Sequence, residues 1–362
     1  MIRATRLVAH QWGLPAPARS AAGTWSERHS LLLVVEDDEG HFGLGEAAPL
    51  PGYSGDSCED AQGALRALLG KELAERDPDA PCSASLKAAS ASVSSRAARA
   101  AVEGALLDLW ARSEDVPAWA LLAGGSVPET APLAVWLPDG VEAALEAAHA
   151  ARAQGVTAFK VKLDARRGLA EGIATLGELR RALGREVTLR ADANQSAIVA
   201  ELEPHLAALR DVGLEWLEEP TAEPLSKSLG LPLALDESLA GGSFPELAAR
   251  PDITALVLKP TALGGIARCL SLAAHAEAHG RACVASHTLE GPVGFMTATA
   301  LALAVPQRAA HGLGPHGRLL TGAPCPALGV PAHALVRWTA AGFGLTLEQA
   351  LEGATVERTE RS

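Results

Sequence analysis

The chain has 362 residues, of which 48% are hydrophobic, and a formal net charge of −12. This length suits a barrel with a smaller partner domain, and the hydrophobic content allows a sizeable core. An acidic surface repels nucleic-acid phosphates and anionic lipid headgroups, so we expect neither as a partner. The five cysteines lack zinc-site spacing, the N-terminus lacks a signal-peptide stretch, and the apolar runs are too short to span a bilayer. We therefore expect a soluble, cytoplasmic protein.

The first third of the chain has the pattern of an α+β domain. Residues 30–36 are apolar and partly β-branched, residues 37–40 offer a turn, and residues 41–46 form a candidate returning strand. From Ser94 to Arg112 the apolar residues recur at helical spacing. We predict a two-stranded hairpin followed by a helix.

After Gly125 the sequence alternates short apolar runs with Ala- and Leu-rich helical segments, which is typical of a parallel βα sheet. Eight such strands favour a closed barrel, and an open doubly wound sheet is the alternative. The position of the polar residues decides between them. The predicted strands are 133–137, 158–163, 187–191, 214–218, 233–235, 253–258, 282–285 and 308–312.

Charged residues stand at the ends of five consecutive predicted strands. Side chains two residues apart on a strand share a face, and in a barrel that face opens at the carboxyl-terminal mouth, where active sites lie. These charged positions are Lys160 and Lys162, Asp192 with Asn194 two residues on, Glu218, Asp236, and Lys259.

Each of these charges alone has an ordinary structural explanation. The lysines could form a solvated edge, Glu218 could begin a helix, and Asp236 could cap one. Unrelated surface charges are not expected at the same end of five consecutive strands. Buried carboxylates need a counter-ion, and three oxygen ligands with open positions suit Mg²⁺, for which Mn²⁺ can substitute.

This combination of residues predicts proton removal next to a carboxylate. Such a proton is very weakly acidic, and a divalent cation on the carboxylate oxygens would stabilise the resulting enediolate. A lysine base must be neutral when it acts. Burial and a neighbouring ammonium both lower the pKa of a lysine, and Lys160 beside Lys162 supplies the second effect.

The strand-end residues, in this order and spacing, resemble the muconate-lactonizing-enzyme subgroup of the enolase superfamily. The resemblance includes residues 45–52 and the helical segment 94–112. It implies a modified TIM barrel, (β/α)7β, with an N-terminal α+β capping domain. The implied domains are the capping domain at 1–125, the barrel with the metal site at 126–320, and a segment at 321–362 that packs back on the capping domain.

The resemblance also implies roles for individual residues. Lys162 would be the general base, Lys259 would face it across a small carboxylate substrate, and Lys160 would tune Lys162 or touch the substrate. The implied Mg²⁺ ligands are Asp192, Glu218 and Asp236. Asn194 and Glu237 would orient these ligands, and Tyr53 and Ser286 would help to close over the substrate.

Residues 258–265 and 45–54 look most like those of o-succinylbenzoate synthases of menaquinone biosynthesis, which dehydrate a cyclohexadiene hydroxy-acid. N-acylamino acid racemases share the lysine pair and are the main alternative. Dipeptide epimerases carry an acidic pair after the last barrel strand. At this place the present chain reads His-Gly-Leu-Gly-Pro (311–315), which disfavours a dipeptide epimerase. The same stretch also departs from the Gly-Leu-Asp-Thr of o-succinylbenzoate synthases. A non-catalytic barrel that binds a carboxylate through Mg²⁺ is the alternative from another class.

Two glycine patterns, at 43–48 and 312–317, imitate a dinucleotide-binding fingerprint. Such a fingerprint must open a helix, and prolines at or after both patterns disfavour one. We interpret both as loop glycines. His287 and His311 stand at predicted strand ends, where we expect hydrogen-bonded structural histidines.

Overall fold

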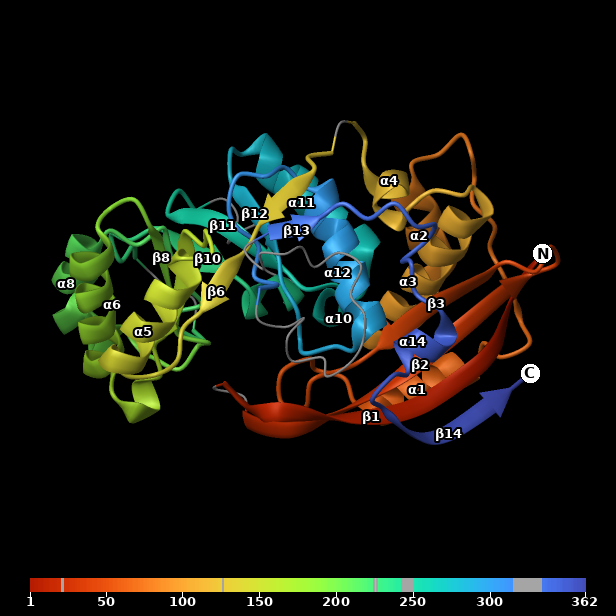
Figure 1. The fold of residues 1–362 in the computed structure, drawn as a ribbon, viewed down its shortest axis with the longest axis horizontal. Coiled ribbons are helices and arrows are strands. Elements are labelled where there is room, and N and C mark those ends of the chain that lie inside the picture. Colours follow the sequence, from red (N-terminus) through yellow and green to blue (C-terminus); the bar gives the residue numbers. More distant parts are fainter. Residues whose placement is uncertain (21–22, 126, 224, 226, 242–249, 315–333) are drawn as a thin grey trace.

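The structure, a computed structural model, describes residues 1–20, 23–125, 127–223, 225, 227–241, 250–314 and 334–362. Its N-terminal part is an antiparallel sheet in the order β14-β1-β2-β3, with β4 paired to β1. Helices lie against this sheet (Figure 1). The elements are β1 (Ile2–Ser20), β2 (Gly23–Asp37), β3 (Phe42–Ala47), α1 (Cys58–Arg66), β4 (Glu72–Leu73), α2 (Cys82–Ser90), α3 (Arg96–Ser113) and α4 (Ala118–Leu122).

The predicted hairpin is present as β2 and β3. Asp37 closes its turn, because its carboxylate accepts hydrogen bonds from the backbone N–H of Glu39 at 3.0 Å and of His41 at 2.8 Å. The predicted helix is α3, and its N-terminus is capped by Ser95, whose hydroxyl accepts from the backbone N–H of Ala98.

The interpretation of Gly43 and Gly45 as loop glycines was wrong, because both lie within β3. A Cβ on Gly43 would come 2.0 Å from the carbonyl oxygen of Ala105, and one on Gly45 would come 1.8 Å from that of Ala101. Both carbonyls belong to α3. The glycines therefore allow the helix to pack directly on the strand, a close approach that side chains would prevent.

The rest of the described chain is dominated by a parallel sheet of seven strands in the order β12-β11-β10-β9-β8-β7-β6. Backbone bridges from His311 to Leu133 and from Gly312 to Ser286 join the two edges of this sheet. The predicted eighth strand is thus reduced to a short closing contact, and the sheet forms a barrel. Its strands are β6 (Ala134–Trp136), β7 (Ala158–Lys162), β8 (Thr188–Asp192), β9 (Trp216–Glu218), β10 (Leu233–Leu235), β11 (Ile253–Leu258) and β12 (Ala282–Ala285).

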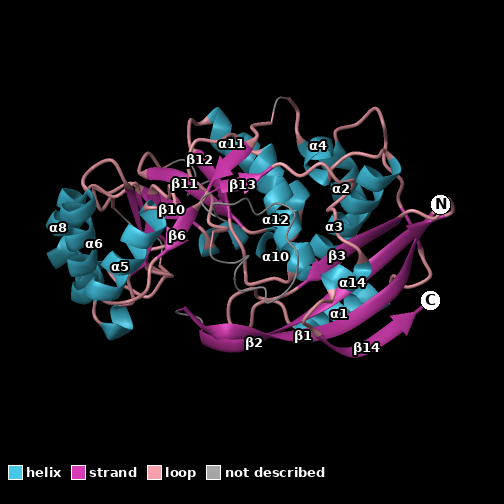
Figure 2. Ribbon diagram, viewed as in Figure 1, coloured by secondary structure: helices cyan, strands magenta, loops and turns pink. Residues whose placement is uncertain are grey.

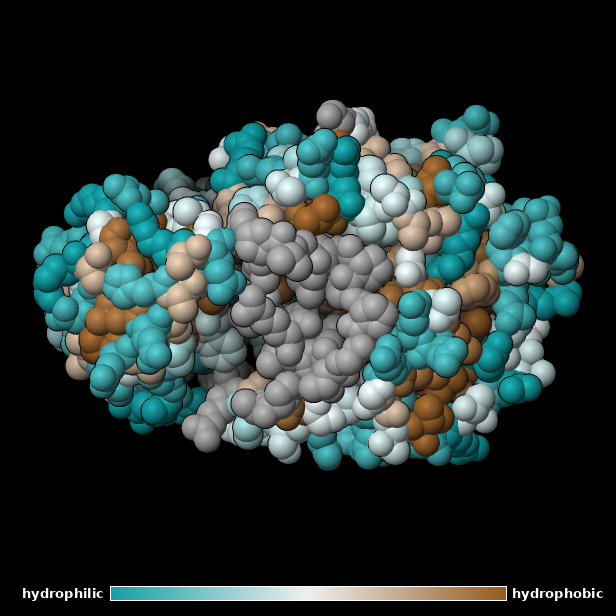
Figure 3. Space-filling view, viewed as in Figure 1, coloured by the Kyte–Doolittle hydropathy of each residue, from teal (hydrophilic) through white to brown (hydrophobic). Residues whose placement is uncertain are grey.

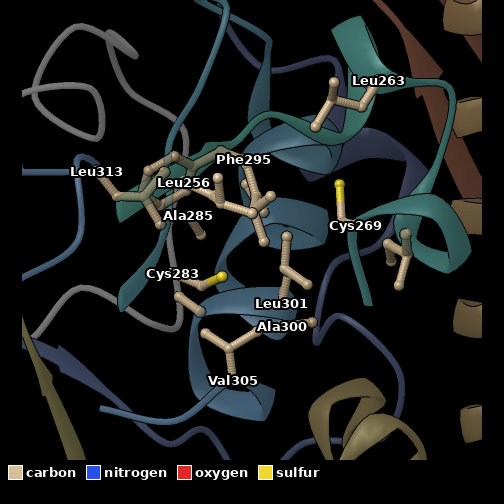
Figure 4. Packing of buried hydrophobic residues seen from close by; sticks show 14 of the residues in the cluster. Leu256, Leu263, Cys269, Cys283, Ala285, Phe295, Ala300, Leu301, Val305 and Leu313 are labelled. Atoms are coloured by element: carbon tan, nitrogen blue, oxygen red, sulfur yellow. The ribbon is translucent and has the colours of Figure 1, made fainter. Parts of the chain in front are cut away.

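Helices follow the barrel strands and cover the outside of the sheet (Figure 2). Side chains of β11, β12, α11 and α12, such as Leu256, Ala285, Cys269 and Phe295, pack together in a dry core (Figure 4). The α-helices are α5 (Val141–Arg152), α6 (Leu169–Leu183), α7 (Val199–Leu202), α8 (Leu206–Val212), α10 (Pro260–Leu263), α11 (Ile266–Ala278) and α12 (Pro292–Ala304), and the 3-10 turns are η1 (Ala165–Arg167), η2 (Glu203–His205) and η3 (Glu237–Ala240).

The C-terminal segment returns to the N-terminal sheet. It contains β13 (Ala334–Val336), paired with β5 (Thr130–Pro132), then α14 (Leu347–Ala350) and β14 (Thr355–Arg361), which pairs with β1. Residues 321–333 of the predicted third segment lie outside the described residues. The four described cysteines are free thiols. Within the described part of the chain, every helix is too short or too polar to cross a lipid bilayer. Hydrophilic residues dominate both ends of the face in Figure 3.

His311 is a structural histidine at the point where the barrel closes. Its Nδ1 accepts a hydrogen bond from the backbone N–H of Ala285 at 3.0 Å, so its Nε2 carries the proton and donates to Gln307 Oε1 at 3.0 Å. The side chain is fully buried. Burial, assisted by the charge of Arg190, lowers the pKa of His311 to about 3.

We expect this histidine to destabilise the fold in acid. Below the ordinary histidine pKa of 6.5 the unfolded chain binds a proton that folded His311 does not bind, so stability falls as the pH drops from about 6.5 towards 3. The slope from this group is about 1.4 kcal/mol per pH unit. Urea unfolding between pH 7 and pH 5 should show a shallower pH dependence in His311→Gln, whereas exposed His279→Gln should match the parent. An unchanged slope in His311→Gln would contradict the assignment.

Candidate active site

The strand-end residues meet at one mouth of the barrel. The registers pair Lys162 with Asp192 and Asp192 with Glu218, so their side chains point the same way on neighbouring strands. Asp236 and Lys259 directly follow β10 and β11. Strands β7 and β11 are separated by β8, β9 and β10 on one side, and by β6, residues 311–312 and β12 on the other. Lys162 and Lys259 therefore approach the mouth from opposite walls.

Lys160 forms ion pairs with two of the carboxylates. Its Nζ lies 2.7 Å from Asp192 Oδ2 and 2.9 Å from Glu218 Oε1, which places these two acids around one cation. Burial alone would lower the pKa of Lys160, but the charges of Asp192 and Glu218 outweigh it and raise the pKa. Burial, together with the charge of Asp192, raises the pKa of Glu218 to about 7. The site holds more negative charge than this single ammonium compensates.

Lys259 is bound to the third carboxylate and to the cap. Its Nζ contacts Asp236 Oδ2 and donates to the hydroxyl of Tyr53 at 2.8 Å, and that hydroxyl donates to Asp236 Oδ1 at 2.8 Å. The ammonium also lies 4.5 Å from the centre of the Tyr53 ring. Burial opposes the charged form of Lys259, but the charges of Asp236, Glu237 and Glu218 together outweigh it and raise the pKa of the amine. Tyr53 thus connects the cap to the barrel site.

Asn194 and Glu237 lie beside the acids. Asn194 donates from its backbone N–H to Asp192 Oδ1 at 3.0 Å, and from Nδ2 to Glu237 Oε1 at 3.2 Å. Burial, then the charge of Asp236, raises the pKa of Glu237 to about 9. Asn194 Oδ1 and Glu237 Oε2 are buried without a hydrogen-bond partner. Two oxygen acceptors are therefore left unsatisfied next to the carboxylate cluster.

Glu219 is a positioning residue that the sequence reasoning missed. Its carboxylate accepts hydrogen bonds from the backbone N–H of Asp236 at 2.7 Å, from the N–H and hydroxyl of Ser238, and from Gln195 Nε2. It fixes the backbone that carries Asp236. Positive φ values at Asn194, Gln195 and Glu219 lie at the ends of β8 and β9, so backbone strain gathers where the acids are presented.

Lys162 lies against an aromatic side chain at the end of the first barrel strand. Its Nζ is 5.2 Å from the centre of the Trp136 ring. Burial lowers the pKa of Lys162, and the charges of Lys160 and Lys259 add to this effect, whereas Asp192 opposes it. The side chain is thus biased towards the neutral amine that a general base requires.

A cavity of about 160 Å³ joins these groups and is lined by both lysines of β7 and by Lys259. Ser286 lines it too, with its hydroxyl donating to the Gly312 carbonyl at 3.2 Å. His287 is a further lining residue, and its Nδ1 accepts from the Leu289 backbone N–H. The structure therefore brings every predicted site residue to one mouth, with Asp236 and Glu237 just behind the cavity wall.

Two buried residues of the cap, to which the sequence analysis assigns no role, hold the cavity walls in place. Arg28 donates to the carbonyls of Ala48 and Leu289 at 2.8 and 3.2 Å, which joins a cap loop to the loop after β12. Glu46 accepts from the backbone N–H groups of Gly291 and Gly294 at 2.8 and 2.9 Å, at the N-terminus of α12. The cap is thereby fixed over the barrel mouth.

The donor set fits Mg²⁺ chemically. Carboxylate oxygens are the ligands this cation prefers, the unsatisfied oxygens of Asn194 and Glu237 lie beside them, and Glu218 lacks full charge compensation. As they stand, no three His, Cys, Asp or Glu side chains in the described ranges form a metal-binding group. Lys160 and Lys259 form ion pairs with the acids instead. A cation would have to replace these ammonium contacts.

Comparisons with known proteins identify the family. Residues 142–350 match the model of the enolase C-terminal domain-like family, and residues 2–123 match that of the mandelate racemase/muconate lactonizing enzyme N-terminal domain. The chain is 27% identical to L-Ala-D/L-Glu epimerase of Clostridium acetobutylicum, over 80% of this chain and 83% of that protein. It is 30% identical to chloromuconate cycloisomerase CbnB of Cupriavidus necator, over 77% of each.

Solved structures share the whole architecture. The chain matches dipeptide epimerase from Methylococcus capsulatus, complexed with Mg and the dipeptide L-Arg-D-Lys, with a TM-score of 0.79 and 26% identity. This match covers 95% of the present chain and 99% of the epimerase. A magnesium-bound relative therefore has the same fold.

Proposed function

Since the chain belongs to the mandelate racemase/muconate lactonizing enzyme family of the enolase superfamily, we propose that it removes the proton next to the carboxylate of a small organic acid. We further propose that the reaction is the syn-dehydration carried out by o-succinylbenzoate synthases. The observation that carries this proposal is the position of Lys162 and Lys259 on opposite walls of one cavity, with the carboxylate-bearing strands between them.

Asp192, Glu218 and Asp236 would hold Mg²⁺, with Asn194 and Glu237 orienting them. When bound, the cation supplies positive charge at the substrate carboxylate and stabilises the enediolate that proton removal creates. Glu219 contributes by holding the backbone N–H of Asp236, so that this carboxylate stays directed at the same place.

Lys162 would take the α proton through its neutral Nζ. The C–O bond to the leaving hydroxyl then breaks, and the Lys162 ammonium would return the proton to the departing hydroxide, which leaves as water. Lys259, which also contacts the Tyr53 hydroxyl, would place its ammonium against the other side of the substrate. Conversion of the cyclohexadiene ring to an aromatic ring provides the driving force, so one base is sufficient.

The lining of the cavity favours this substrate over a dipeptide. A dipeptide presents an ammonium that needs an acidic partner, and among the described lining residues the carboxylates are Asp192 and Glu218, both already assigned to the metal. Racemisation of N-acylamino acids is the second candidate. The two lysines on opposite walls favour it, since each could serve one face of the α carbon.

A direct assay separates these functions. Protein and Mg²⁺ are incubated in heavy water with the cyclohexadiene hydroxy-acid precursor of o-succinylbenzoate and, in parallel, with N-succinylamino acids. Aromatic product from the first supports the proposal, and deuterium incorporation into the second without dehydration supports the racemase. Absence of both reactions would support a carboxylate-binding barrel and overturn the proposal.

A further inference from the structure

Trp136 is an exposed aromatic side chain inside the catalytic cavity. It ends β6, pairs in register with Lys160, and keeps 41% of its surface exposed. Among the described residues, several large hydrophobic side chains are exposed, and Trp136 is the one of these that lines the cavity containing the lysines. Trp136 therefore offers accessible apolar area to a ligand in this cavity.

The cavity has apolar lining from both the cap and the barrel. Trp25 and Ala18 come from the tip of the β1–β2 hairpin, which reaches across to the barrel in Figure 1. Leu50 comes from the cap loop after β3, and the barrel contributes the remaining apolar side chains. The apolar lining residues are Ala18, Trp25, Leu50, Ala134, Trp136, Val257, Val284 and Leu289. A substrate that fills this cavity therefore joins a charged head to an uncharged, flat or apolar body.

We propose that Trp136 is the platform on which a planar ring of the substrate stacks, with Trp25 of the cap bordering the same space. This inference rests on the proposed function and specifies its substrate class as carboxylic acids whose acidic carbon belongs to, or adjoins, an unsaturated ring. Stacked unsaturated rings gain attraction beyond the area they bury, whereas a puckered saturated ring offers the indole no π face and gains only the burial. Lys162 Nζ lies over the Trp136 ring, 5.2 Å from its centre, so a substrate ring on this face of the indole would lie next to the base.

A simpler role for Trp136 would be to shield Lys162 from water. Substitution of Trp136 by leucine distinguishes the two roles. Leucine keeps an apolar side chain beside the amine but offers no flat face, whereas phenylalanine keeps the face and loses area. A shield would treat planar and puckered ligands alike, and a platform would discriminate between them.

The test is calorimetric binding of o-succinylbenzoate and of its ring-saturated counterpart, 2-succinylcyclohexane-1-carboxylate, to the Mg²⁺-loaded protein. We expect Trp136→Leu to weaken the planar ligand about 3- to 10-fold and the saturated one less than about twofold, with Trp136→Phe recovering most of the difference. Val356→Ala truncates an exposed apolar side chain on β14, away from the cavity, and should match the parent.

Equal weakening of both ligands, no weakening, or failure of the parent protein to prefer the planar ligand would overturn this inference. The outcome is separable from that of the proposed function. Ring selectivity without dehydration would remove only the reaction assignment, whereas dehydration that proceeds with Trp136→Leu and no change in ring selectivity would remove only the platform.

Discussion

Replacing Lys162 with alanine is expected to reduce α-proton removal by at least ~10³-fold while leaving the fold intact. The loss follows from the chemistry, because the other amine on this strand, Lys160, lies beside Asp192 and Glu218, whose negative charges raise its pKa and disfavour the neutral form that a base requires. The measurement is deuterium exchange at the α carbon of the substrate, with circular dichroism to monitor the fold. Lys227→Ala, which removes an exposed amine paired with Glu203, is the matched control and should retain full exchange.

The pH profile gives a second measure of the same assignment. Burial, assisted by Lys160 and Lys259, lowers the pKa of Lys162, and the base acts when neutral. The rate should therefore rise with pH, with a midpoint below the ordinary lysine pKa of 10.5. Exchange that survives in Lys162→Ala, or a rate that falls across this rise, would remove Lys162 from the role of base.

The barrel was largely predictable from the sequence because each buried strand is a short apolar run between helical segments. The predicted strands 233–235, 253–258 and 282–285 coincide with β10, β11 and β12. The predicted strand 308–312 forms only bridges at His311 and Gly312, because closure needs pairing at just two positions. The closed barrel, and not the open sheet, follows from these bridges.

The set of residues that meet at the site was predictable, because parallel strands present their carboxyl ends at one edge of the sheet. What the sequence could not show is which groups pair there. The sequence predicts that Lys160 tunes the pKa of Lys162 or touches the substrate, whereas in the structure its ammonium forms ion pairs with Asp192 and Glu218. Such pairing depends on side-chain directions across strands, which spacing along one strand does not encode.

Residues that hold the cap in place were missed for a related reason. Glu46 contacts Gly291 and Gly294, which lie 245 and 248 positions away in the chain, so no local pattern indicates the contact.

The role of Glu219 was missed for a different reason. Glu219 follows Glu218 on the strand, so alternation turns its side chain away from the mouth. A pair of adjacent acids at a strand end is a signal that one could serve the site and the other its scaffold.

Replacing Asp192 with asparagine is expected to weaken Mg²⁺ binding by at least about 100-fold, since losing even an outer partner of a ligand costs roughly 10- to 100-fold in affinity. The substitution keeps the shape but removes the charge that the cation requires, and it also removes the ion pair with Lys160. Calorimetric titration with Mg²⁺ should show the same direction for Asp236→Asn and a smaller effect for Glu237→Gln. Glu203→Gln, at an exposed carboxylate, should bind as the parent does. Equal affinities in the parent, Asp192→Asn and Asp236→Asn would place the cation elsewhere and leave the buried acids with only their lysine partners.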